Sequence, residues 1–237
     1  MLPVQLILIG VAGILVQIAF IIVENKKKWV PAVCLKGLAS VIFVIFGWYA
    51  GRIGAQALNF TEPYIARFIF IGLILGALGD ILLNLRFCFK KGQIAFLAGI
   101  AAFLAGHVFY ILYAAKQLEY VIIYIGIGIV LAVVLLFFIF KNLKDIKPAF
   151  KIFGAVYIGI VSVMAVCAAG CIIEFQTTPN ILFGIGALLF LVSDIVMVFN
   201  TFGKTQRLSL RATNLLLYYL GQLMIGATLF FFEGIYF

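Results

Sequence analysis

The chain has 237 residues, of which 66% are hydrophobic and 11% charged, and its net charge is +9 at pH 7. Soluble domains carry about 25% charged residues, so this composition excludes a soluble globular protein and indicates an integral membrane protein. The basic residues lie between apolar runs rather than in one patch, so they are expected to flank the membrane and not to bind nucleic acid.

Apolar runs of about 20 residues can span a bilayer as helices. The expected spans, in chain order, are 3–23, 31–50, 64–85, 93–115, 119–140, 150–172, 180–201 and 212–233. The connections are short, so neighbouring helices should be antiparallel. The positive charges follow the first run instead of preceding it, which favours a retained helix over a signal peptide. The predicted fold is an all-α, polytopic membrane protein with eight transmembrane helices, and residues 1–237 form a single integral-membrane domain.

The distribution of positive charge predicts the orientation of the chain. The first, third, fifth and seventh connections hold thirteen of the seventeen Lys and Arg residues, namely Lys26, Lys27, Lys28, Arg86, Lys90, Lys91, Lys141, Lys144, Lys147, Lys151, Lys204, Arg207 and Arg211. Cytoplasmic loops are enriched in Lys and Arg. We therefore expect a multi-pass protein of the plasma (cytoplasmic) membrane with its odd-numbered loops in the cytoplasm and both termini outside.

Short matches between the two halves of the chain indicate an internal repeat. "LGDIL" in the third run corresponds to "VSDIV" in the seventh, and Gly106-His107 in the fourth corresponds to Gly221-Gln222 in the eighth. "KGLASV" in the second run corresponds more weakly to "IGIVSV" in the sixth. These matches suggest two four-helix halves in parallel orientation, as in membrane proteins with parallel repeats.

Five polar residues of five different helices are expected at one depth. Asp80 precedes Arg86 by six residues, which places it about 9 Å inside the cytoplasmic boundary at 1.5 Å per residue. The same count places Lys36, Tyr157 and Tyr218 about 9–12 Å inside, with Asp194 at a similar or slightly greater depth. A charge in the hydrocarbon costs at least about 2.5–3.5 kcal/mol and normally faces a partner or a cavity. The two aspartates are therefore expected to meet in a functional site.

Other interpretations of these polar residues remain open. Lys36 could form a purely structural ion pair with one aspartate. Asn84, one turn from Asp80, could bond its carboxylate, a lipid headgroup or a neighbouring helix. His107 follows Lys91 by sixteen residues, about 24 Å, so it is expected in the far half of the membrane, packed away from the aspartates unless a deep cavity reaches it.

Several of these motifs together resemble one family. "GALGDILLNLRF" (76–87), Gly106-His107 followed by Tyr110, "FLVSDIVMVF" (190–199) and "YYLGQLMIG" (218–226) are similar to the YhhN family of membrane proteins, which includes lysoplasmalogenases. Lys36 and Tyr157 also resemble family positions, although Gly37 stands where a proline often follows that lysine. The resemblance covers most of the chain. It implies hydrolysis of the vinyl ether bond of lysoplasmalogens to a fatty aldehyde and glycerophosphoethanolamine or glycerophosphocholine.

The residues suit this chemistry. A vinyl ether is cleaved by protonation of its β-carbon, addition of water to the oxocarbenium ion and collapse of the hemiacetal. Two carboxyls in a low-dielectric site can share one proton. We expect one of Asp80 and Asp194 to be the acid and the other to stabilise the cation and orient water. The expected substrate-binding residues are Lys36, Asn84, Tyr157, Tyr218, Gln222 and His107. The scheme requires no metal or other cofactor, and the expected partners are a lysophospholipid substrate and membrane lipids.

Two other classes of function are compatible with the sequence. Intramembrane Asp, Lys and His side chains also mark proton or substrate paths in transporters, and parallel repeats occur there too. Against a transporter, the aspartates are expected toward one side of the membrane, and no helix is plainly broken in its middle. The third class is a structural or lipid-binding protein.

Overall fold

The computed structural model describes residues 3–58, 65–89, 92–143 and 148–231. All regular elements in these ranges are α-helices, and eight of them are long and apolar enough to cross a membrane. They are α1 (Val4–Asn25), α2 (Trp29–Leu58), α3 (Ala66–Leu85), α4 (Gly92–Ala115), α5 (Val121–Asn142), α6 (Pro148–Phe175), α7 (Thr178–Phe202) and α8 (Leu208–Thr228). The predicted fold class is confirmed.

Two helices extend four residues or more beyond the predicted spans because charged residues lie within them. α2 continues to Leu58, past the predicted end at 50, and the Arg52 guanidinium lies 5.9 Å from the centre of the Trp48 ring. α8 begins at Leu208, four residues early, and its Arg211 pairs with Glu24 at 2.7 Å. α8 ends at Thr228, five residues before the predicted end of the last span. The predicted start of the third span at 64 and the predicted end at 233 lie outside the described residues.

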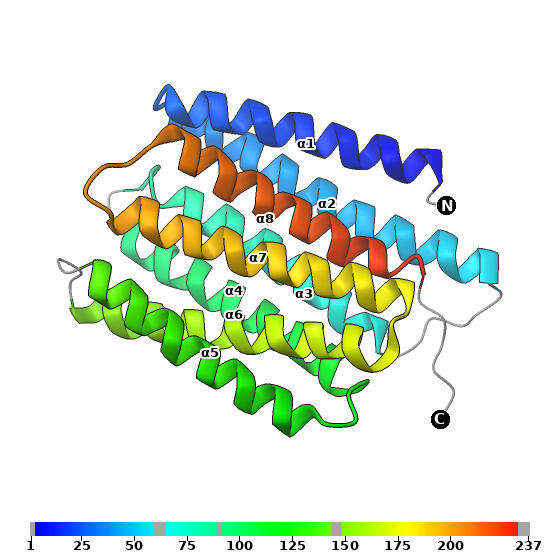
Figure 1. Cartoon of the computed structure of the whole chain (residues 1–237). Helices are drawn as coiled ribbons and strands as arrows, with labels where there is room; N and C mark the ends of the chain where they lie inside the picture. Colours follow the sequence, from blue (N-terminus) through cyan, green and yellow to red (C-terminus); the bar gives the residue numbers. More distant parts are fainter. Residues whose placement is uncertain (1–2, 59–64, 90–91, 144–147, 232–237) are drawn as a thin grey trace.

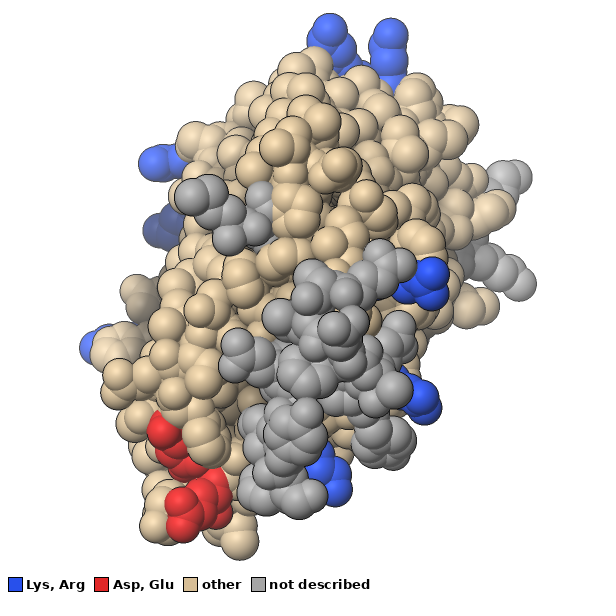
Figure 2. Space-filling model, turned by 90° about the vertical axis from the view of Figure 1, so that its right-hand side faces the viewer, with Lys and Arg blue, Asp and Glu red and all other residues tan. Residues whose placement is uncertain are grey.

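The helices run side by side along the length of the molecule, as Figure 1 shows. The helix ends that face the connections α1–α2, α3–α4, α5–α6 and α7–α8 lie at one end, and the start of α1 and the end of α8 lie at the other. We call the first end the odd-loop end. Figure 2 shows the opposite end, where acidic side chains gather at one edge and basic ones lie around the periphery. There the Glu174 carboxylate accepts hydrogen bonds from the backbone N–H groups of residues 119 and 120.

The order of neighbouring helices is the same in the two halves of the chain. α1 packs on α2, α2 on α3 and α3 on α4, just as α5 packs on α6, α6 on α7 and α7 on α8. The contacts between the halves also correspond, because α4 packs on α6 and α8 packs on α2. This arrangement agrees with the expected parallel repeat of four helices.

Two glycines make the same close approach in each half. A Cβ atom on Gly106 of α4 would lie 3.2 Å from the carbonyl oxygen of Gly72 on α3. A Cβ on Gly221 of α8 would lie 2.8 Å from the carbonyl oxygen of Gly186 on α7. Small residues allow membrane helices to pack closely, so these pairs bring α3 against α4 and α7 against α8. Asp80 and Asp194 lie eight residues after Gly72 and Gly186 and are therefore at corresponding positions.

The orientation in the membrane stays a prediction, and cysteine labelling tests it. Cys88 is exposed in the α3–α4 connection, so in a Cys34→Ser background a membrane-impermeant maleimide should label it in inside-out vesicles and not in right-side-out vesicles. Lys116, which is exposed beyond the end of α4, offers the matched control: Lys116→Cys with Cys34 and Cys88 replaced by Ser should show the reverse pattern. Labelling of Cys88 in right-side-out vesicles would overturn the predicted orientation.

Candidate active site

Asp80 is the centre of a buried polar cluster near the odd-loop end. Its Oδ2 atom lies 3.1 Å from the Lys36 ammonium and accepts hydrogen bonds from Ser40 Oγ at 2.6 Å and Tyr218 hydroxyl at 2.9 Å. The side chains of Lys36 and Asp80 are 2% and 7% exposed. Hydrogen bonds to an ionised group are stronger than neutral ones, so this arrangement stabilises Asp80 as an anion.

Aromatic rings enclose the ammonium of Lys36. Its Nζ atom lies 4.5 Å from the centre of the Tyr218 ring and 5.7 Å from that of Phe20, distances at which a cation is attracted to the ring face. The ion pair that the sequence left open is therefore present, with Asp80 as the partner. This burial directs the ammonium toward Asp80 instead of a lipid headgroup.

The cluster extends through a chain of hydrogen bonds toward the middle of the bundle. The amide Nε2 atom of Gln222 donates a hydrogen bond to the Tyr218 hydroxyl at 3.4 Å. The Tyr110 hydroxyl in turn donates to the amide Oε1 atom of Gln222 at 2.9 Å. Ser40 and Tyr110 were not among the predicted site residues. The signal was present in both cases, because Ser40 lies one turn after Lys36 and Tyr110 belongs to the motif that begins at Gly106.

Asp194 has a different environment. Its carboxyl is buried and interacts with the Tyr157 side chain, while its Oδ2 atom has no hydrogen-bond partner in the described part of the chain. Tyr157 itself is half-buried and also interacts electrostatically with Asp80. Among the described residues no interaction joins the two carboxyls directly. The expectation that the aspartates meet stays a prediction: each has partners of its own, and Tyr157 interacts with both.

Packed aromatic rings connect the partners of the two aspartates, and His107 is one of these rings. Its ring lies 4.6 Å from Phe190 and 5.7 Å from Tyr157, both in edge-to-face contact, and Phe190 also contacts Tyr218 at 5.1 Å. Neither ring nitrogen has a hydrogen bond of good geometry within the described ranges.

His107 is therefore closer to the site than the sequence suggested. The backbone of His107 does lie at the expected depth, because its neighbour Gly106 packs against Gly72 of α3, which is eight residues away from Asp80 along that helix. Side chains of a helix point back toward its N-terminus, and the N-terminus of α4 lies at the odd-loop end. The ring thus leans toward the aspartates and reaches Tyr157, which a count of residues along the backbone could not show.

Asn84 does not contact the carboxylate of Asp80. Its Nδ2 atom donates to the backbone carbonyl of Asp80 at 2.9 Å, within the same helix. The side chain therefore supports the last turn of α3 beneath the site. Among the described residues, no group of three His, Cys, Asp or Glu side chains is placed to hold a metal ion.

The two halves differ at the positions that contact the aspartates. In the pairing of "KGLASV" with "IGIVSV", Lys36 corresponds to Ile158 and Ser40 to Ser162. Ser40 bonds Asp80, whereas the Ser162 hydroxyl is buried without a hydrogen-bond partner in the described structure. The aspartate of α3 thus has a cation beside it, and the corresponding position for the aspartate of α7 is apolar.

Comparison with known proteins identifies the family. The model of the YhhN family matches residues 32–229, which include every residue of the polar cluster. The chain belongs to the YhhN family. α1 lies outside the matched range and packs on α2 and α8. Neither the curated proteins nor the solved structures gave a match.

The Lys36–Asp80 pair predicts strong thermodynamic coupling. Removing one partner of a buried ion pair costs about 3–5 kcal/mol, because the other charge stays buried without compensation. Lys36→Met and Asp80→Asn should each lower the free energy of unfolding by this amount, and the double variant should lose much less than the sum. Unfolding in detergent measures the cycle, with Lys116→Met at an exposed position as the control. Additive losses would mean that the pair does not stabilise the bundle.

Proposed function

We propose that this YhhN protein is a membrane-embedded hydrolase that cleaves the vinyl ether bond of lysoplasmalogen, or of a related lysolipid, to a fatty aldehyde and a glycerophospho-alcohol. The observation that carries the proposal is the unequal environment of two buried aspartates in a member of this family. Asp80 pairs with Lys36 at 3.1 Å, whereas Asp194 interacts with Tyr157 and has one unbonded carboxyl oxygen among the described contacts.

This difference favours one assignment of roles, which the sequence alone left open. A carboxylate in apolar surroundings without a cationic partner is costly, so Asp194 is the carboxyl that carries a proton. Asp80, with its ammonium and two hydroxyl donors, is the anion. Asp194 is thus the general acid, and Asp80 stabilises positive charge and accepts a proton from water.

The steps follow from this assignment. Asp194 gives its proton to the β-carbon of the vinyl ether, and the resulting oxocarbenium ion is stabilised by the Asp80 carboxylate. Water adds to the α-carbon while Asp80 accepts its proton. The hemiacetal then breaks between this carbon and the ether oxygen. Asp80 returns its proton to the leaving glycerol oxygen, and the hemiacetal hydroxyl gives its proton to Asp194 as it becomes the aldehyde carbonyl, which restores both carboxyls. In this scheme Tyr218 and Gln222, which share a hydrogen bond of 3.4 Å, orient the water, and Tyr157 holds the acid.

Aldehyde release from purified protein tests the proposal. Wild type in detergent should release fatty aldehyde from 1-alkenyl lysophosphoethanolamine or lysophosphocholine, and Asp80→Asn and Asp194→Asn should each reduce kcat by at least about a hundredfold, the scale of acid–base catalysis. Glu119→Gln, the same change at an exposed site, should keep full activity. Size-exclusion chromatography checks folding. Full activity in either aspartate variant would refute the assigned roles.

A transporter is the second candidate, and the corresponding packing of the two halves favours it. In that case, vesicles containing the protein should take up substrate in response to a proton gradient, and an uncoupler should abolish uptake. If wild type releases no aldehyde but shows such uptake, and Asp194→Asn loses it, the hydrolase proposal is replaced by this one.

A further inference from the structure

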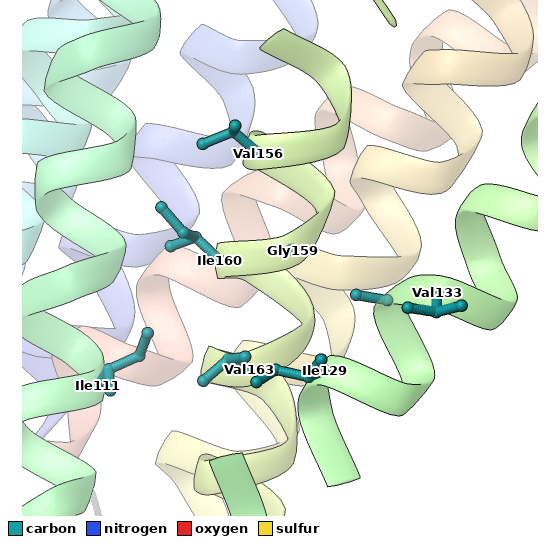
Figure 3. A pocket seen from close by; sticks show the side chains of 8 residues that line it. Ile111, Ile129, Val133, Val156, Gly159, Ile160 and Val163 are labelled. Carbon is teal, nitrogen blue, oxygen red and sulfur yellow. The ribbon is translucent and has the colours of Figure 1, made fainter. Parts of the chain in front are cut away.

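An apolar groove lies on the outside of the bundle between α4, α5 and α6. Its volume is about 260 Å³, and no polar side chain lines it. Figure 3 shows Ile111 of α4 and Ile160 of α6 beside the space between these helices, with Val133 of α5 on the other side. The full lining consists of Ile111, Ile129, Ala132, Val133, Val156, Gly159, Ile160 and Val163.

The groove faces the region that lipid occupies. Ile129, Val133 and Val156 are about half exposed or more, at 54%, 62% and 50%, although they belong to helices apolar enough to span a membrane. A Cβ atom added to Gly159 would have no heavy atom within 4 Å. The missing side chain at Gly159 therefore keeps part of the groove open to hydrocarbon.

The groove and the polar site share two helices, α4 and α6, and neighbouring residues of these helices contribute to each. Ile111 lies one turn after His107 on α4, and Val156 and Ile160 lie on either side of Tyr157 on α6. Tyr157 is half-buried and touches the His107 ring on one side and the Asp194 carboxyl on the other. Tyr157 thus forms the boundary between the lipid-facing groove and the buried acid.

The direction of the groove suits a lipid whose headgroup lies at the odd-loop end. From Val156 to Val163 the lining extends along α6 by seven residues, about 10 Å, away from that end of the molecule. A chain in the groove would therefore have its first carbons beside Tyr157 and its remaining carbons toward the middle of the bilayer.

We propose that this groove binds the single fatty chain of the lysolipid substrate and sets the depth at which its first carbons meet Asp194. The inference rests on the proposed hydrolase function and adds the location of the chain.

Two glycines of α6 provide a matched pair of variants. Gly159 lines the groove, whereas Gly154 does not, and a Cβ atom at either position would meet nothing within 4 Å. Gly159→Leu should lower kcat/KM for a long-chain 1-alkenyl lysophosphocholine by about tenfold, which corresponds to about 1.4 kcal/mol, and change it less than about twofold for a short-chain analogue. Gly154→Leu should leave both values unchanged. If kcat/KM depends on chain length in the same way in the wild type and both variants, the groove does not bind the chain, while the hydrolase function stays intact.

A binding measurement separates the groove from the chemistry. A lysophosphocholine with a non-cleavable alkyl ether chain and a diazirine in the middle of that chain is photolysed with the protein, and labelled peptides are mapped by mass spectrometry. Label on α4, α5 and α6 that decreases in Gly159→Leu and persists in Gly154→Leu supports the groove even if wild type releases no aldehyde, in which case only the proposed reaction fails. Label confined to other helices overturns the inference.

Discussion

The need to compensate a charge inside hydrocarbon governs the centre of this bundle. Lys36 and Asp80 are almost fully buried and 3.1 Å apart, and neither would be tolerated alone at this depth. The pair requires α2 to lie against α3, and the hydrogen bond from Tyr218 to the same carboxylate oxygen adds α8. Three helices from both halves of the chain are thus held by one carboxylate, and the rings and hydroxyls around it take their positions from that constraint.

The two halves of the chain show how a repeated architecture can support unequal chemistry. The backbone approach at Gly106 is repeated at Gly221, so the helix pairs are built alike. The side chains are not, since Lys36 has an isoleucine as its counterpart. Tyr218 likewise has Phe103 as its counterpart, because each lies three residues before the matched glycine of its half. The centres of these two rings are 6.0 Å apart. Similar scaffolds therefore present one carboxylate beside a cation and one carboxyl in apolar surroundings.

The sequence predicted the helices and much of the polar cluster because both depend on local properties. Hydropathy locates the ends of most helices within three residues, with α2 and α8 as the exceptions. Counting from basic anchors brings Lys36, Asp80 and Tyr218 to one depth. The sequence could not reveal which aspartate forms the ion pair with Lys36, because that depends on the rotation of α2 about its axis. It also placed His107 too far from the site, because ring contacts depend on side-chain direction as well as on depth. The groove was not predicted, since an apolar lining has no distinct pattern in a chain that is apolar throughout.

The position of the polar cluster near one end of the bundle has a consequence for the supply of substrate. In the proposed hydrolase, a lipid in the leaflet at the odd-loop end brings its glycerol region to Asp80 and Asp194 while its headgroup stays in water. A lipid in the opposite leaflet has its headgroup on the wrong side of the aromatic layer around His107 and Phe190. The protein would therefore act on one leaflet only, and the rate at which lipids cross the bilayer would set how much of the total pool it can consume.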